Sequence, residues 1–210
     1  SLLSFLCLIG IQTAFAFGAS VPVALKDYSG VATELFNNMR VPAALIAGAI
    51  VPIGFLSTPS IQPDDSGILK LQKRMHVLLA LASLQSQVVA VTYSTIAINK
   101  LAEVTLLPTR GVGELLNQHY KLAWLGTNTH FLFGLFGFGL LVLSSVFIQK
   151  FGNEVGKIAS CWTIANLLLC FSIVNRGISQ GFGVEGGEMM KVGGNLVTLA
   201  WSYAKLLFAR

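Results

Sequence analysis

The sequence predicts an all-α, polytopic helical membrane protein with about four transmembrane helices. Of its 210 residues, 54% are hydrophobic and only 11% are charged, and the mean hydropathy is +0.71, so the chain is more apolar and less charged than soluble domains. Long apolar stretches also recur, and the clearest, 129–148, contains a single ionisable residue, His130. A helix of about twenty apolar residues crosses a bilayer core with every backbone hydrogen bond made internally.

Residues 1–25 form an uncharged, hydrophobic N-terminal segment. The small-residue pattern Ala14-Phe15-Ala16 ahead of Phe17 is typical of a signal-peptide cleavage site, whereas the apolar length also suits a retained anchor. Both interpretations stay open. An Ala-x-Ala pattern followed at once by Phe resembles the plastid-entry motif of algae with red-derived secondary plastids, and that resemblance implies entry into a plastid.

A four-helix transmembrane domain is expected over residues 26–177. Its first span is expected to begin at Arg40, with Pro42 in the first turn, where the missing N–H of proline breaks no helical hydrogen bond. The apolar part of this span, residues 41–56, contains only sixteen residues. It therefore crosses a bilayer only when it is tilted, when the bilayer thins around it, or when the preceding turn extends the helix.

The second span, residues 71–101, carries a polar stripe. His76, Ser83, Gln87 and Ser94 recur at steps of seven, four and seven residues, which places them on one helix face. Because polar side chains inside a membrane do not face lipid without cost, the stripe is expected to face protein, a ligand or water. Gln87 is a candidate ligand of a magnesium-centred ring, but we favour a hydrogen bond from Gln87 to a neighbouring helix.

The third and fourth spans are expected at 129–148 and 156–174, after a connector with a short surface helix over 113–120. A tight polar turn over 149–154 predicts that the two spans form an antiparallel hairpin. Asn166 lies with small and polar residues on one face of the fourth span. Like Gln87, it is a candidate ligand of a ring or a residue that hydrogen-bonds across helices, and the second role needs no cofactor.

The C-terminal region, residues 178–210, is expected to contain a flexible stretch over 181–187 and an amphipathic helix over 192–210. We interpret this helix as interfacial, because Lys205 is unfavourable inside a bilayer. A fifth crossing is the alternative.

His130 is the strongest candidate for ligation of a planar pigment. Gly126, Gly134 and Gly137 fall on the same helix face as His130, so the histidine lies in a trough of missing side chains. Such a trough admits a neighbouring helix or a ring such as chlorophyll or haem whose metal the histidine ligates. His76 is a second candidate axial ligand, or an interfacial histidine next to two basic residues.

Motifs and composition exclude several functional classes. The sequence has no basic stripe of the kind that nucleic acid requires, so nucleic acid is not an expected partner. It also has no nucleophile motif, no P-loop and no paired carboxylates on a span, and only three histidines, which predicts a non-catalytic protein. The three cysteines lack metal-ligand spacing, and we interpret them as buried structural residues.

Residues 34–177 as a whole resemble multispan plastid membrane proteins of diatoms, haptophytes and related algae, although they contain no motif of known chemistry. The resemblance implies a multi-pass protein of the thylakoid membrane. It further implies an accessory subunit at the edge of a photosystem and its antenna, which links or stabilises antenna proteins and photosystem core subunits. On the small-residue faces of the spans we expect one to a few chlorophylls or carotenoids. Two alternatives are a small transporter or channel that uses the polar stripe of helix 71–101, and an accessory subunit of a mitochondrial inner-membrane complex.

Overall fold

The computed structural model describes residues 25–103, 108–148, 153–181 and 194–208. Their elements, in chain order, are β1 (Lys26–Asp27), α2 (Ser29–Val51), the π-helix η1 (Pro52–Leu56), α3 (Gly67–Glu103), β2 (Pro108–Thr109), α4 (Val112–His119), α5 (Lys121–Ile148), α6 (Asn153–Gly181) and α7 (Gly194–Phe208). The two short strands pair antiparallel, with Lys26 opposite Thr109. The chain divides into two compact units, with the boundary within α6 between Leu167 and Leu168.

Four helices of the described chain are long and apolar enough to cross a membrane. They are Ser29–Leu56, Gly67–Glu103, Lys121–Ile148 and Glu154–Val174. At a rise of about 1.5 Å per residue, the shortest of them reaches the roughly 30 Å of a hydrocarbon core. The predicted all-α class and the four candidate spans are therefore confirmed.

The first span is longer than predicted, because the helix begins at Ser29 and not at Arg40. Pro42 consequently lies inside α2, where it cannot donate a hydrogen bond to the carbonyl four residues earlier. The prediction that Pro42 occupies the first turn was wrong. At Pro52 the helix widens into η1, and the Ser57 amide donates to the Pro52 carbonyl at 2.8 Å, five residues back. Such π-turns commonly accommodate an interruption of the α-helical ladder.

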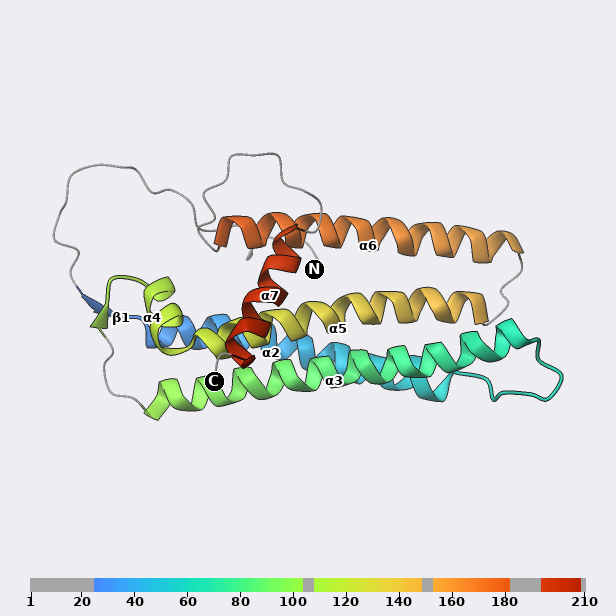
Figure 1. Ribbon diagram of the computed structural model, residues 1–210, viewed down its shortest axis with the longest axis horizontal. Helices are drawn as coiled ribbons and strands as arrows, with labels where there is room; N and C mark the ends of the chain where they lie inside the picture. The colour runs from blue at the N-terminus through green and yellow to red at the C-terminus, as the bar shows by residue number, and fades with distance from the viewer. Residues whose placement is uncertain (1–24, 104–107, 149–152, 182–193, 209–210) are drawn as a thin grey trace. The chain divides into compact units, whose positions relative to one another are not determined.

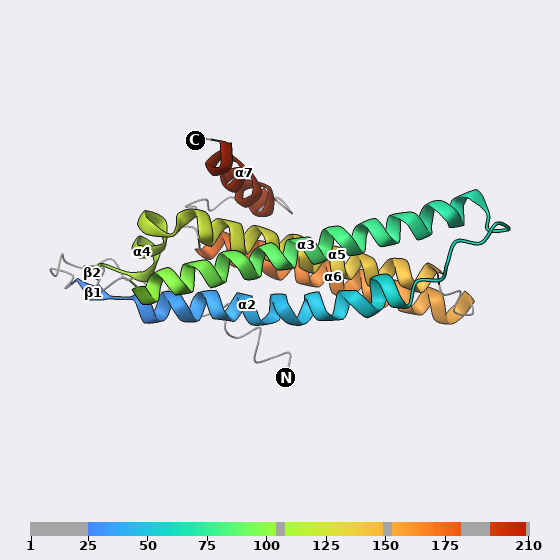
Figure 2. The same cartoon turned by 90° about the horizontal axis from the view of Figure 1, so that it is seen from below.

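Helices α2, α3 and α5 lie side by side and form the core of the unit over residues 25–167 (Figures 1 and 2). Ile50, Ala80 and Leu141, one from each helix, are fully buried together. Close approach of the first span to α3 requires a glycine at position 54, because a Cβ there would overlap the Cβ of Ala80. Small residues thus set the distance between helices, as they commonly do in membrane proteins.

The predicted connector helix is confirmed as α4, but only part of it lies at the surface. Leu115 and Leu116 are buried in a cluster that includes Phe36 of α2 and Leu101 of α3. Trp124, near the start of α5, packs its ring edge against Phe36, with ring centroids 5.6 Å apart and an interplanar angle of 86°. Helix α4 therefore closes one end of the three-helix core, because its apolar face needs cover that the ends of α2 and α3 provide.

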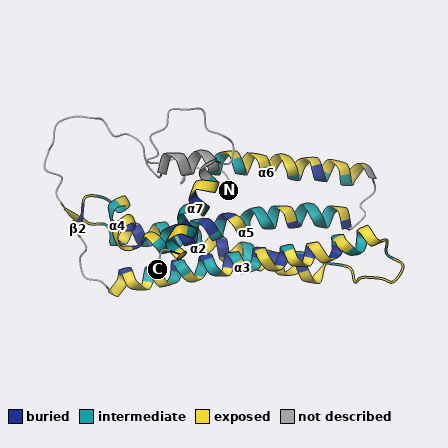
Figure 3. Ribbon diagram, viewed as in Figure 1, coloured by how far each residue is buried: buried dark blue, intermediate teal, exposed yellow. Residues whose placement is uncertain are grey.

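Helix α6 is mostly exposed along its described side chains (Figure 3). Its contact with α5 includes Gly139, where an added Cβ would meet the Leu167 side chain. Cys161 and Cys170 are exposed, so the prediction that they are buried was wrong for these two residues. The turn expected to join α5 and α6 falls largely on residues 149–152, which lie outside the described residues.

The C-terminal helix is present as α7, and its 15 residues span about 22 Å. Lys205 Nζ lies 5.5 Å from the centre of the Trp201 ring. The helix is shorter than a hydrocarbon core, which favours the interfacial placement, and that placement stays a prediction. The N-terminal hydrophobic segment lies outside the described residues except for Leu25. The stretch expected to be flexible, 181–187, also lies outside them except for Gly181, which ends α6.

Candidate functional site

The polar stripe of α3 faces α5. His76, Ser83, Gln87 and Ser94 are each at most 2% exposed. Each of them meets a polar group of α5: His76 Nδ1 lies 3.1 Å from Ser144 Oγ, Ser83 Oγ donates to the Gly134 carbonyl at 2.7 Å, Gln87 Nε2 donates to the Phe131 carbonyl at 3.3 Å, and Ser94 Oγ lies 3.4 Å from Thr127 Oγ1. We call this set of contacts the α3–α5 polar seam.

Glycines of α5 make room for the polar seam. A Cβ at Gly134 would lie 2.6 Å from Gln87 Cδ, and a Cβ at Gly137 would lie 3.0 Å from Ser83 Cβ. The trough predicted beside His130 therefore exists, and the side chains of Gln87 and Ser83 occupy it at these two glycines. Hydrogen bonds that cross helices in this way are a common means of membrane helix association.

His76 lies between three elements instead of at an exposed interfacial position. Besides its contact with Ser144, its Nε2 lies 3.2 Å from the carbonyl of Ile53 in η1. The sequence analysis offered an interfacial histidine as an alternative role for His76. It did not predict the contact with Ile53, because it did not place the end of the first span beside α3. Both ring nitrogens have a polar neighbour, and the enclosed side chain leaves no open face for a planar ring.

Gln87 has one buried oxygen that no described residue satisfies. Its Nε2 donates to Phe131, but its Oε1 has no hydrogen-bond partner among the described residues, and neither has Thr129 Oγ1 on α5. An amide oxygen of this kind is a chemically suitable ligand for magnesium, but Gln87 is fully buried between two helices. A chlorophyll ring needs an open face at its axial ligand, and full burial of Gln87 leaves none.

His130 and Asn166 occupy more open positions. His130 is half-buried on α5, and its ring stacks on that of Tyr93 of α3, with centroids 6.4 Å apart and an interplanar angle of 23°. Asn166 is exposed on α6, where its amide donates to the Trp162 carbonyl of its own helix at 2.9 Å. The structure does not bring the four candidate ligands to one site. Of the four, these two are the ones that are not fully buried, and their ligation of a pigment stays a prediction.

A partly buried ion pair lies where the loop after η1 meets α3. Lys73 is only 5% exposed, and its Nζ donates to Asp65 Oδ2 at 2.6 Å and to the Ser60 carbonyl at 2.8 Å. The sequence interpretation placed Lys73 at the membrane surface and Asp65 in a plain loop, and it missed the pair. The sequence feature that could have predicted the pair is the presence of two opposite charges eight residues apart, one in the loop and one at the start of the helix.

This ion pair predicts acid sensitivity. The hydrogen bond from Lys73, aided by one from the Gln62 amide, holds the pKa of the Asp65 carboxyl below its ordinary value of 3.8. A carboxylate with a lowered pKa stabilises the fold above its unfolded pKa, and the stabilisation disappears as the pH falls through the folded pKa. We expect the thermal unfolding midpoint in detergent to fall as the pH drops below about 4 and through the lowered pKa of Asp65, and Asp65→Asn to start lower and to fall less.

The matched control is Asp64→Asn, because Asp64 is exposed on the same loop. It should keep the midpoint and the acid response of the natural protein. An acid response that Asp65→Asn leaves unchanged would show that other groups cause it.

The fold defines a class: an all-α chain with four helices long and apolar enough to span a membrane. Among the described residues, no group of three or more histidine, cysteine or acidic side chains is placed to hold a metal ion. Comparisons with protein-family models, with curated proteins and with solved structures found no match.

Proposed function

We propose that this protein is a multi-pass, non-catalytic accessory subunit of a photosystem–antenna supercomplex in the thylakoid membrane. In this role it stabilises the contact between antenna proteins and photosystem core subunits. The thylakoid location and the photosystem partner are supported by the resemblance of residues 34–177 to multispan plastid membrane proteins. The accessory role is supported by a contrast in burial: α2, α3 and α5 pack against one another, whereas the described side chains of α6 are mostly exposed.

The observation that carries the proposal is the exposure of α6. Trp162 is 73% exposed and Ile158 is 68% exposed, and Asn166 on the same helix is also exposed. An exposed amide such as that of Asn166 on a helix of spanning length is better covered by another protein or a pigment than by lipid chains, and Trp162 and Ile158 extend the same exposed surface. Helix α6 is therefore our proposed contact with the larger complex.

The closed polar seam makes the transporter alternative less favourable. A channel would need the stripe of α3 to line water, but all four side chains face α5 within hydrogen-bonding distance. Within the described spans, the one buried lysine or arginine is Lys73, which pairs with Asp65 near the start of α3. Neither feature provides a path for ions along the helix.

Pigment analysis of the native complex tests the His130 prediction. If His130 is an axial ligand, His130→Leu should lower the chlorophyll content by about one molecule per chain, because an axial ligand holds one ring. The measurement is pigment extraction and an absorption spectrum from the detergent-solubilised complex, purified from the same host. His119→Leu is the control, since His119 is exposed on α4, outside the spans. Equal chlorophyll in both variants would reject ligation by His130.

Crosslinking tests the accessory role separately from pigment binding. A photoreactive residue at Trp162 should crosslink to photosystem or antenna subunits in the native membrane. The same residue at Leu45, which is 70% exposed on α2, should crosslink to them far less. The photosystem assignment is rejected if the Trp162 probe crosslinks to subunits of a different complex, or if the chain purifies with no photosynthetic subunit.

A further inference from the structure

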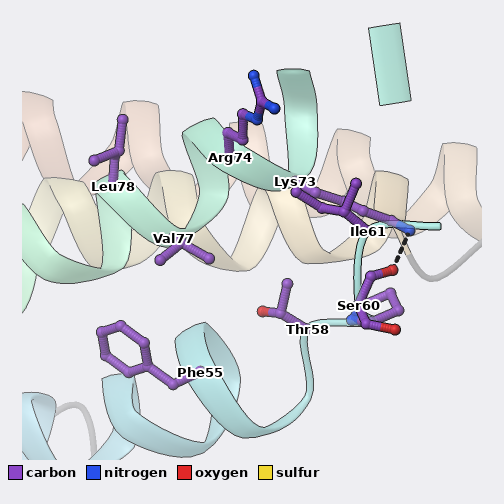
Figure 4. A pocket seen from close by; sticks show the side chains of 9 residues that line it. Phe55, Thr58, Ser60, Ile61, Lys73, Arg74, Val77 and Leu78 are labelled. Carbon is purple, nitrogen blue, oxygen red and sulfur yellow. Dashed lines mark hydrogen bonds between the residues drawn. The ribbon is translucent and has the colours of Figure 1, made fainter. Parts of the chain in front are cut away.

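An open groove lies at one end of the first two spans, between η1, the loop over 57–66 and the first turns of α3 (Figure 4). Its volume is about 530 Å³, and apolar side chains form most of its lining. Phe55, Val77 and Leu78 are 38%, 39% and 57% exposed. The groove thus presents an apolar surface that no described residue covers.

The groove lies at the depth of the lipid headgroups when α3 spans a bilayer. The 37 residues of α3 measure about 55 Å, which exceeds a hydrocarbon core of about 30 Å. Arg74 follows the helix start at Gly67 by seven residues, or about 10 Å. The loop before α3 is polar and carries Asp64 and Asp65. The apolar lining therefore continues from the headgroup region toward the acyl chains.

Charges around the groove leave a net cation at its rim. Lys73 points across the groove toward Ser60 (Figure 4), and Asp65 neutralises it. Lys70 donates to the Pro63 carbonyl at 2.7 Å. Arg74 is exposed, and no carboxylate of the described residues lies within ion-pair distance of it. Asp64 is the remaining acidic group on the loop, so Arg74 and Lys70 together outweigh it.

We propose that this groove binds one anionic phospholipid. An acyl chain lies along Phe55, Val77 and Leu78, and the phosphate meets the Arg74 guanidinium. The planar guanidinium matches a phosphate with two parallel hydrogen bonds, and the exposed apolar lining selects a lipid over a free anion. This inference rests on the membrane placement proposed above, but not on a photosystem partner.

Native mass spectrometry of the full chain in a mild detergent tests the lipid site. Phosphatidylglycerol and phosphatidylcholine with identical acyl chains are added at equal concentration. We expect the protein to retain phosphatidylglycerol about tenfold more than phosphatidylcholine. Arg74→Gln should abolish this preference and Arg74→Lys should weaken it, because lysine keeps the charge but not the two-pronged geometry. Lys100→Gln, at the other end of α3, should leave it unchanged.

Three outcomes would overturn the lipid site: equal retention of both lipids, an Arg74→Gln variant that behaves like Lys100→Gln, or displacement of the bound lipid by millimolar inorganic phosphate. The last result would mean that the groove holds a free anion and not a lipid. Alkaline extraction of native membranes distinguishes these failures from a failure of the membrane placement. A chain that alkali releases from the membrane contradicts the placement itself, whereas a retained chain without lipid preference contradicts the groove alone.

Discussion

Gly134→Leu is expected to separate α3 from α5 and to destabilise the fold by about 3 kcal/mol. Even a Cβ at this position would lie 2.6 Å from Gln87 Cδ, and a leucine adds three further carbons. Gln87 cannot withdraw without losing its hydrogen bond to the Phe131 carbonyl. Gln87 and Gly134 are both buried, so the leucine has no open space to enter. The free energy of unfolding should be measured by denaturant titration in detergent micelles, with circular dichroism reporting helix content.

Two variants control for this effect. Gly48→Leu introduces the same side chain on α2, where a Cβ meets nothing within 4 Å, and it should leave stability nearly unchanged. Gln87→Ala in the Gly134→Leu background should restore part of the loss, because it removes the side chain that the leucine displaces. Equal stability of Gly134→Leu and Gly48→Leu would contradict the described approach of α3 to α5.

Gly54→Ala is expected to cost about 2 kcal/mol, the second largest effect. The added Cβ would overlap the Cβ of Ala80 and would lie 3.6 Å from its Cα. Unlike Gln87, Ala80 has no flexible side chain that can move away, so the backbones of η1 and α3 must shift. The same denaturant titration in micelles gives the free energy of unfolding for this series.

Exchanging the small residues at positions 54 and 80 tests whether their contact causes the loss of stability in Gly54→Ala. Ala80→Gly alone should destabilise by about 1 kcal/mol, through helix propensity and a lost methyl contact. The double variant Gly54→Ala with Ala80→Gly should be more stable than the sum of the two single effects, because the methyl group moves from one side of the contact to the other. Gly48→Ala is the neutral control on the same span. Strict additivity of the two single effects would rule out the direct contact.

The positions of the long helices could be predicted from local sequence pattern. The apolar stretch over 129–148 is long enough to cross a bilayer, so this part of α5 was predictable from composition alone. The earlier start of the helix, at Lys121, was not predicted. The spacing of His76, Ser83, Gln87 and Ser94 indicated a single face correctly, since helical periodicity depends only on neighbouring residues. The start of the first span was not predictable in the same way, because polar residues from Ser29 onward form helix only where Ala32 and Phe36 are buried against other elements.

The contacts of the candidate site needed the tertiary structure. The sequence left open whether the polar stripe faces protein, ligand or water, and whether the glycines beside His130 receive a helix or a ring. The arrangement of α3 against α5 places Gln87 against Gly134 and Ser83 against Gly137. Which surfaces meet depends on the packing of residues about fifty positions apart, whose separation along the chain has no periodic signal.

By itself, the sequence determined that this is an all-α chain with four helices of spanning length, because apolar length and helical period are local properties. Only the tertiary structure decided that its polar stripe is enclosed, that Lys73 is buried and pairs with Asp65, and that the described side chains of α6 are mostly exposed. The physical reason is that burial and pairing are properties of two surfaces together. A single helix face carries the same residues whether it meets water, lipid or another helix.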